Sequence, residues 1–136
     1  MNAKKRITAT LAGFIVYFLL GWLVYGFLLR DFYAANSTAS VMRPDAEMVW
    51  WALIVGNILQ SYLLVYIFGN WANVETFGDG FKNGFVLGLI MSFAMGLTMY
   101  GTMDFNSLTA TLVDPFVFAA MMGITGGVIG IVLGKK

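Results

Sequence analysis

The fold is decided by the stretch LTATLVDPFVFAAMMGITGGVIGIVL, residues 108–133, in which Asp114 is the one charged residue. A helix of about 20 apolar residues crosses the roughly 30 Å hydrocarbon core of a bilayer. Three more stretches, residues 7–29, 48–69 and 81–103, are long and apolar enough to do the same. Hydrocarbon offers the backbone no water to bond, and none of these stretches alternates as a barrel strand does, so each is expected to be a helix. We therefore predict an all-α membrane protein: a single domain over residues 1–136, with four transmembrane helices in an antiparallel bundle.

Composition narrows the possible functions. Hydrophobic residues make up 60% of the chain and charged residues 11%, whereas charged residues form about a quarter of ordinary soluble domains. The chain has no Cys and no His, which removes thiolate nucleophiles, imidazole bases and the usual ligands of zinc, haem and iron–sulfur clusters. The sequence also lacks a recognisable nucleophile and base pair, a phosphate-binding loop and a basic aromatic surface. We expect a non-enzymatic protein without a cofactor or nucleic acid, whose main partner is the lipid bilayer.

The distribution of charge predicts the orientation in the membrane. Four spans place both termini on one side, and both termini are basic, at residues 4–6 and 135–136. The short connection of residues 70–80, with Lys82 at its edge, falls on the same side. This side then carries six basic and two acidic residues, and the other side two basic and five acidic ones. Because Lys and Arg collect on the cytoplasmic side, we expect both termini to be cytoplasmic.

Small residues recur every four positions along two neighbouring spans, a pattern called a glycine zipper. The third span carries Gly80, Gly84, Gly88, Ser92 and Gly96. The fourth carries Gly126, Gly130 and Gly134, beside Ala119, Gly123 and Gly127. Such rows let helix backbones approach closely in lipid, and the short connection near residues 104–107 makes the two helices adjacent and antiparallel. We expect these helices to pack tightly, and any surplus glycine face to be available to a second subunit of a homo-oligomer or larger complex.

The third span also carries a ladder of methionines on the face of its glycines. At about 100° per residue, one face holds Gly84, Gly88, Met91, Ser92, Met95, Thr98, Met99, Thr102 and Met103. The opposite face holds Val86, Ile90, Phe93 and Leu97. We expect the first face to be buried in protein and the second to meet lipid. Thioethers are soft ligands that suit Cu(I), but the favoured interpretation of the ladder is adaptable filling against glycine.

A polar cluster is predicted deep in the second span. Asn57, Gln60 and Ser61 lie three and four residues apart near its middle. The favoured interpretation is hydrogen bonding between helices, worth about 0.6 to 2 kcal/mol per bond. The alternative is an intramembrane polar site on a permeation path or around a polar ligand.

Asp114 is the other candidate for such a site. If the fourth helix begins near Asp114, the carboxylate caps it and Pro115 occupies the first turn. This is the favoured interpretation. If the helix begins at Ser107, Pro115 lies inside it and Asp114 is a carboxylate within the bilayer, which marks a functional-site hypothesis.

The first and third spans share the pattern G-x-x-x-Y-G near their outer ends, at residues 21–26 and 96–101. An acidic residue and a phenylalanine follow each copy, at Asp31-Phe32 and Asp104-Phe105. The pattern suggests two duplicated helical hairpins, an arrangement found among transporters. Chance similarity between apolar segments explains the pattern equally well.

Three segments carry a resemblance to a family: LLGWLVYGFLLRDFY at residues 19–33, GNILQSYLLVYIFGNWA at 56–72 and FAAMMGITGGVIGIVLGKK at 118–136. They resemble small, uncharacterised four-span proteins of the bacterial inner membrane that are carried as a domain of unknown function. The resemblance implies that location and supplies no activity. With the composition, it favours a non-enzymatic accessory, scaffold or self-assembling component. The alternative function is a small channel or transporter for a cation or small polar solute.

Overall fold

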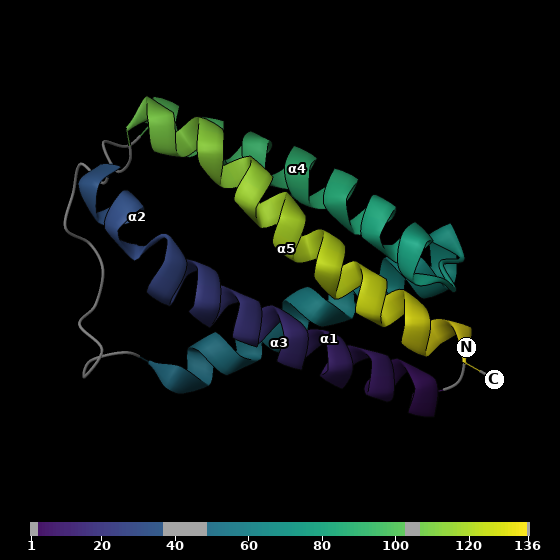
Figure 1. The fold of residues 1–136 in the computed structure, drawn as a ribbon. Coiled ribbons are helices and arrows are strands. Elements are labelled where there is room, and N and C mark those ends of the chain that lie inside the picture. Colours follow the sequence, from purple (N-terminus) through teal and green to yellow (C-terminus); the bar gives the residue numbers. More distant parts are fainter. Residues whose placement is uncertain (1–2, 37–48, 103–106, 136) are drawn as a thin grey trace.

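The computed structural model describes residues 3–36, 49–102 and 107–135, and these residues form helices and no strand. Four long apolar helices pack together (Figure 1). The first is α1 (Ala3–Leu23) with a π-helical turn, η1 (Val24–Leu28), and a short helix α2 (Arg30–Asn36) follows it. The second is α3 (Trp50–Ile67), which ends in another π-helical turn, η3 (Phe68–Ala72). The last two are α4 (Phe77–Thr102) and α5 (Leu108–Gly134).

The helices are long enough to cross a bilayer. The four candidate spans contain 26, 23, 26 and 27 residues, which at a rise of about 1.5 Å per residue is roughly 35 to 40 Å. Hydropathy placed the boundaries within four residues of those observed, and residues 48 and 103 lie outside the described part of the chain. α1 and α4 begin earlier than predicted, because hydropathy marks the hydrocarbon core whereas a helix continues into the polar interface. Thr76 caps α4 there, since its Oγ1 accepts a hydrogen bond from the N–H of Asp79 at 3.2 Å.

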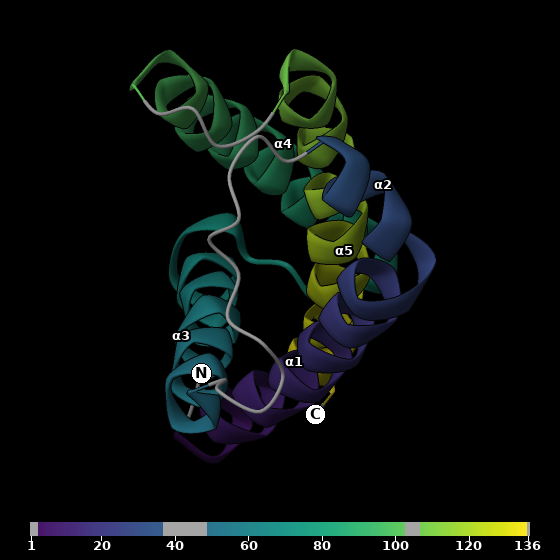
Figure 2. The ribbon, with the colours of Figure 1, turned by 90° about the vertical axis from the view of Figure 1, so that its left-hand side faces the viewer.

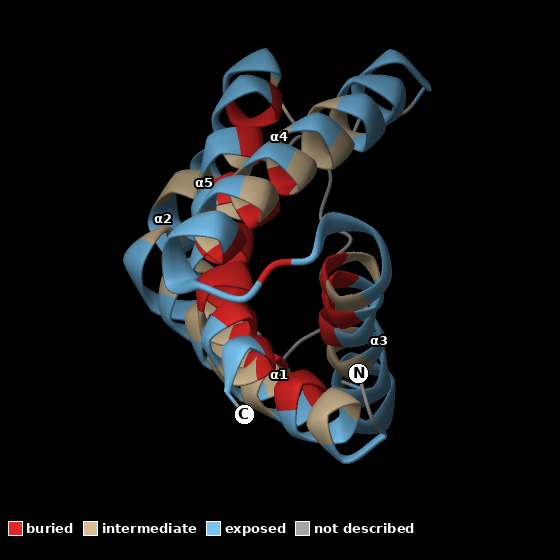
Figure 3. Cartoon of the chain, turned by 90° about the vertical axis from the view of Figure 1, so that its right-hand side faces the viewer, coloured by how far each residue is buried: buried red, intermediate tan, exposed pale blue. Residues whose placement is uncertain are grey.

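α5 is the central helix of the structure. Of its most apolar 18 residues, 56% are buried, whereas the corresponding share in the other three spans is 11 to 22%. Figure 2 shows α5 with α4 on one side and α1 on the other, while α3 stands apart from α4 and packs on α1. The buried residues accordingly gather on α5 and on the facing sides of its neighbours (Figure 3).

The glycine rows of α4 and α5 meet in the inner half of the protein, the half that contains both termini. A Cβ atom at Gly80 would collide with the carbonyl oxygen of Gly126, and one at Gly84 with that of Met122. A Cβ at Gly88 would lie 2.9 Å from the Cβ of Met122. Added Cβ atoms on α5 would also meet close neighbours: aromatic rings of α4 at Gly123 and Gly127, and the Thr76 carbonyl at Gly130. At Gly80, Gly84 and Gly130 an added side chain would have to move a neighbouring backbone, whereas at Gly123 and Gly127 it would have to move an aromatic ring.

α4 and α5 separate beyond this contact, which corrects the predicted face of α4. Gly84 and Gly88 are buried, but Met95, Thr98, Met99 and Thr102 on the same face are exposed, and Met103 lies outside the described residues. Phe93, which was expected to meet lipid, packs edge-on against Phe116 of α5 with ring centroids 5.7 Å apart. At this level side chains, among them these two rings, lie between the helices, whereas glycine rows bring the backbones together in the inner half. At Gly96 the nearest atom of α5 to an added Cβ would be 3.9 Å away, in Thr111.

α1 joins α3 to α5 at one crossing point. Ser61 of α3 is fully buried and donates a hydrogen bond of 2.7 Å to the carbonyl oxygen of Thr10 in α1. Gly13 leaves room for this contact, because a Cβ there would collide with the Ser61 hydroxyl and lie 2.7 Å from Ile129 of α5. The two termini lie at the same end of the structure (Figure 1), where Lys5 Nζ donates to the Leu133 carbonyl at 3.3 Å.

The glycine contact generates a prediction about stability. Gly88→Leu should lower the free energy of unfolding by about 1 to 3 kcal/mol, because the added side chain overpacks the closed contact with the buried Met122 side chain. Thermal melting in detergent checks the effect. Gly78→Leu is the matched control on the same helix, since a Cβ at Gly78 meets nothing within 4 Å. Equal melting temperatures for the two variants would contradict the contact.

Candidate functional site

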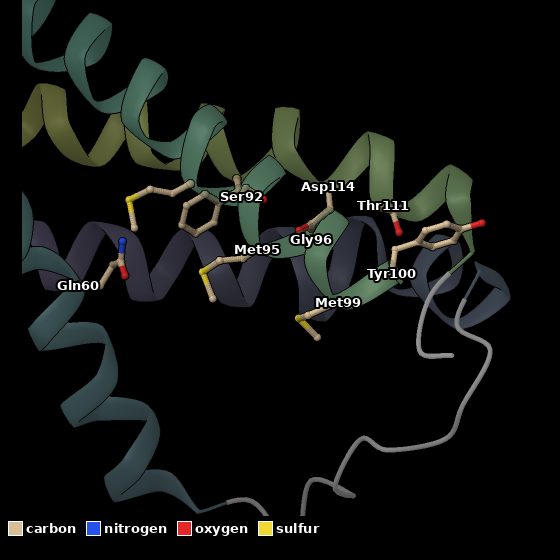
Figure 4. Close-up of a pocket in the computed structure, with 10 residues that line it drawn as sticks. Gln60, Ser92, Met95, Gly96, Met99, Tyr100, Thr111 and Asp114 are labelled. Carbon is tan, nitrogen blue, oxygen red and sulfur yellow. The ribbon is translucent and has the colours of Figure 1, made fainter. Parts of the chain in front are cut away.

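A cavity of about 400 Å³ lies between α3, α4 and α5 in the outer half of the protein. Figure 4 shows the lining side chains, which come from Gln60, Met91, Ser92, Met95, Gly96, Met99, Tyr100, Thr111, Asp114 and Phe118. Gln60 lies near the middle of its span, whereas Tyr100 lies in the last turn of α4. The cavity therefore extends from the middle of the helices toward their outer ends. It occupies the region where α4 and α5 separate.

Asp114 belongs to the wall of this cavity, and its predicted role as a helix cap is wrong. α5 begins at Leu108, and the cap is Ser107, whose hydroxyl accepts from the N–H of Ala110 at 3.2 Å. Asp114 is six residues further on, roughly 9 Å along the axis, so its carboxyl group lies at or inside the outer edge of the hydrocarbon. Pro115 lies within the helix and has no N–H to donate to the carbonyl of Thr111. The local sequence is compatible with a helix that begins near Ser107 or near Asp114. In the structure the hydroxyl group of Ser107 caps the helix.

The Asp114 carboxyl group is also bound by Tyr25, from the end of the first span. The Tyr25 hydroxyl donates a hydrogen bond of 3.0 Å to Asp114 Oδ1. Tyr25 lies in η1, the π-helical turn that ends α1, and such turns frequently occur at functional sites. Tyr25 was not among the predicted site residues, although the shared G-x-x-x-Y-G pattern contains both Tyr25 and the cavity residue Tyr100. The suggested duplication of hairpins stays a prediction.

The predicted polar cluster of α3 is not a single site. Ser61 bonds to α1, as described above, whereas Gln60 lines the cavity and its Nε2 lies 3.4 Å from the sulfur of Met122. Asn57 donates its amide hydrogen at 2.7 Å to the Leu53 carbonyl of its own helix. The structure thus brings Gln60 together with Asp114 at one cavity and leaves Asn57 and Ser61 outside its lining.

The methionine ladder of α4 also lines the cavity. Met91, Met95 and Met99 all contribute to the wall, and 64% of the Met95 side chain is exposed. The interpretation of the ladder as filling against glycine is therefore wrong for Met95 and Met99. The methionine that fills this role is Met122 of α5, which is fully buried against Gly88.

The hydrogen bond of Ser61 generates a second prediction. Ser61→Ala should lower the free energy of unfolding by about 1 kcal/mol, because a buried carbonyl loses its interhelical donor. Asn57→Leu, one turn away on the same helix, should change it by less than about 0.5 kcal/mol, since the Asn57 amide bonds only within α3. Chemical denaturation in mixed micelles measures both. A larger loss for Asn57→Leu than for Ser61→Ala would contradict the assignment.

Comparison with known proteins places the chain in a family. No curated protein and no solved structure matches it. The model of the family described as "Protein of unknown function (DUF1761)" matches residues 8–130, which include parts of all four long helices. The predicted resemblance to a domain of unknown function is confirmed. The chain is a multipass membrane protein and belongs to the DUF1761 family.

Proposed function

We propose that the protein binds a small, positively charged solute in the cavity between α3, α4 and α5. The observation that supports this is the position of Asp114, whose carboxyl group lies within a membrane-spanning helix and lines a cavity of about 400 Å³. Ionisable groups inside membrane spans are expensive to keep, and they commonly face cavities and mark the paths or binding sites of ions and substrates. Among the lining residues that belong to the described part of the chain, Asp114 is the only charged one.

A binding or carrier role fits the geometry better than an open channel. The cavity occupies the outer half, whereas in the inner half the backbones of α4 and α5 touch at Gly80, Gly84 and Gly126. A solute that enters from outside therefore meets close-packed glycine rows below the cavity. Passage through the membrane would require α4 and α5 to separate along these rows.

The proposed protein is non-enzymatic, as the sequence predicts, but its proposed role differs from the one that the sequence favours. Sequence alone favoured an accessory, scaffold or self-assembling component over a transporter for a cation or polar solute. The joint placement of Gln60 and Asp114 on one cavity favours solute binding. The protein then acts as a carrier, or as the solute-binding subunit of a larger membrane complex.

A homo-oligomer or larger assembly is part of the proposal. Added Cβ atoms at Gly56 of α3 and Gly101 of α4 would meet nothing within 4 Å. Small residues on open helix faces allow a helix of another subunit to approach. Light scattering of the purified protein in detergent tests this, and a mass of one chain would contradict it.

We place the protein in the bacterial inner membrane with both termini in the cytoplasm. Basic residues at positions 4–6, Lys82 and positions 135–136 support this orientation, and the bond from Lys5 to Leu133 supports a common side for both termini. A phosphatase that is active only outside the cytoplasm should be inactive when fused to the C-terminus and active when inserted near Thr38. The reverse pattern would overturn the orientation.

The solute-binding proposal predicts ligand-dependent stability. A cation that binds the folded protein raises its free energy of unfolding by about 2.7 kcal/mol at 100 times its Kd. We expect at least one cation from a panel of Na⁺, K⁺, Cu(I), tetramethylammonium and tetraphenylphosphonium to raise the melting temperature of the parent protein. The same cation should leave Asp114→Asn unchanged, while Asp79→Asn, which changes an exposed acid at the inner end of α4, should respond like the parent. No response to any cation in the parent, or equal responses in Asp114→Asn, would contradict the proposal.

A further inference from the structure

The side chains that line the cavity indicate which kind of cation it can bind. Three of its side chains are thioethers, Met91, Met95 and Met99, and two are aromatic, Tyr100 and Phe118. Hydroxyl and amide groups from Ser92, Thr111 and Gln60 are spread between them. The site therefore combines one carboxyl group with a mainly apolar wall.

The size of the cavity excludes a close fit to a bare inorganic ion. Cavities of about 300 to 1,000 Å³ hold drug-sized organic molecules, and this one has about 400 Å³. A small alkali cation at Asp114 would leave the apolar wall at Met91 and Phe118 without a ligand contact. An organic molecule can reach both ends of the cavity at once.

The spacing of the methionines also argues against a site built for a soft metal. Met91 and Met99 are eight residues apart on one helix, which is about 12 Å along its axis. The sulfur atoms of three methionines in such a row cannot all surround one ion. Within residues 3–36, 49–102 and 107–135, no group of three or more His, Cys, Asp or Glu side chains is placed to complete a metal site.

The same methionines suit an organic ligand. The Met side chain is unbranched and polarisable, so a wall of methionines adapts to ligands of different shape. Aromatic rings such as those of Tyr100 and Phe118 attract organic cations through their faces. Met95 and Tyr100, which line the cavity, are 64% and 44% exposed, so an amphiphilic ligand can reach the cavity from the surface of the helix bundle.

We propose that the solute is a hydrophobic organic cation, whose charged centre lies at Asp114 and whose apolar body lies against Met95, Met99 and Phe118. This inference rests on the proposed function and specifies its substrate class. Tyr25 is a positioning residue in this site, because its hydroxyl bonds Asp114 Oδ1 and holds the carboxyl group at the cavity wall.

Binding of tetraphenylphosphonium to the full chain in detergent tests the inference. Tetraphenylborate is the matched probe, since it has nearly the same shape and the opposite charge. Saturable binding, defined by competition with unlabelled probe, is expected for the cation and not for the anion. Asp114→Asn should weaken it about tenfold or more, equivalent to about 1.4 kcal/mol, and Asp79→Asn should bind as the parent does. Gly96→Leu should also weaken binding, because the new side chain occupies the cavity where an added Cβ has 3.9 Å of clearance from Thr111.

The outcomes separate this inference from the proposed function. If tetraphenylphosphonium shows no saturable binding, or binds Asp114→Asn equally well, while a small cation stabilises the protein through Asp114, the inference fails and the proposed function stands. Binding of Ag⁺ that Met95→Leu abolishes, without binding of the organic cation, would replace the inference with a thioether metal site. If no cation acts through Asp114, both fail. Comparison of the two probes on the parent protein decides the charge preference even if Asp114→Asn does not fold.

Discussion

The backbone contact between α4 and α5 determines the arrangement of the other helices. Lipid chains are as apolar as the helix surfaces, so burial of apolar area supplies little drive for helix association in a membrane. Close approach of backbones provides the attraction instead. Gly80 and Gly84 of α4 touch backbone atoms of α5 near Gly126 and Met122, which brings the helices together without any intervening side chain. α5, covered on one side by this contact and on the other by α1, becomes the one helix that is mainly buried.

The same contact explains why a cavity exists. The close backbone contact of the glycine rows extends as far as Gly88, and beyond it α4 and α5 meet through side chains such as the Phe93–Phe116 pair. The space that opens exposes the methionines of α4 and the Asp114 carboxyl group of α5. The inner half of the α4–α5 pair, which is rich in glycine, is therefore closed. The outer half, where larger side chains lie between the helices, is open. The proposed binding of a solute from the side opposite the termini rests on this asymmetry.

The sequence predicts correctly those features of the fold that depend on a single physical effect. Hydrophobic length alone predicted the four helices, and the short connection before Ser107 predicted that α4 and α5 are adjacent. The predictions from sequence were wrong at positions where the local sequence allows two different arrangements. Both Ser107 and Asp114 have the chemistry of a helix cap, and their order along the chain does not say which one begins the helix. The roles of Ser61 and Asn57, one turn apart, depend on which of them meets α1, and this depends on the crossing angle of two helices. The Met95 side chain is compatible with burial or exposure, and which of the two occurs depends on how closely α4 and α5 approach at its level, which the sequence does not specify.

Substituted cysteines provide the most direct test of a protein that is closed inside and open outside, because the natural chain has no Cys. Met95 and Ile90 of α4 are equally exposed, at 64% and 62%, but only Met95 lines the cavity. Met122 is fully buried at the glycine contact. A charged thiol reagent applied from outside should modify Met95→Cys rapidly, and Ile90→Cys and Met122→Cys slowly or not at all, since one faces lipid and the other the closed contact. Equal rates at Met95→Cys and Ile90→Cys, or rapid modification of Met122→Cys, would contradict the account.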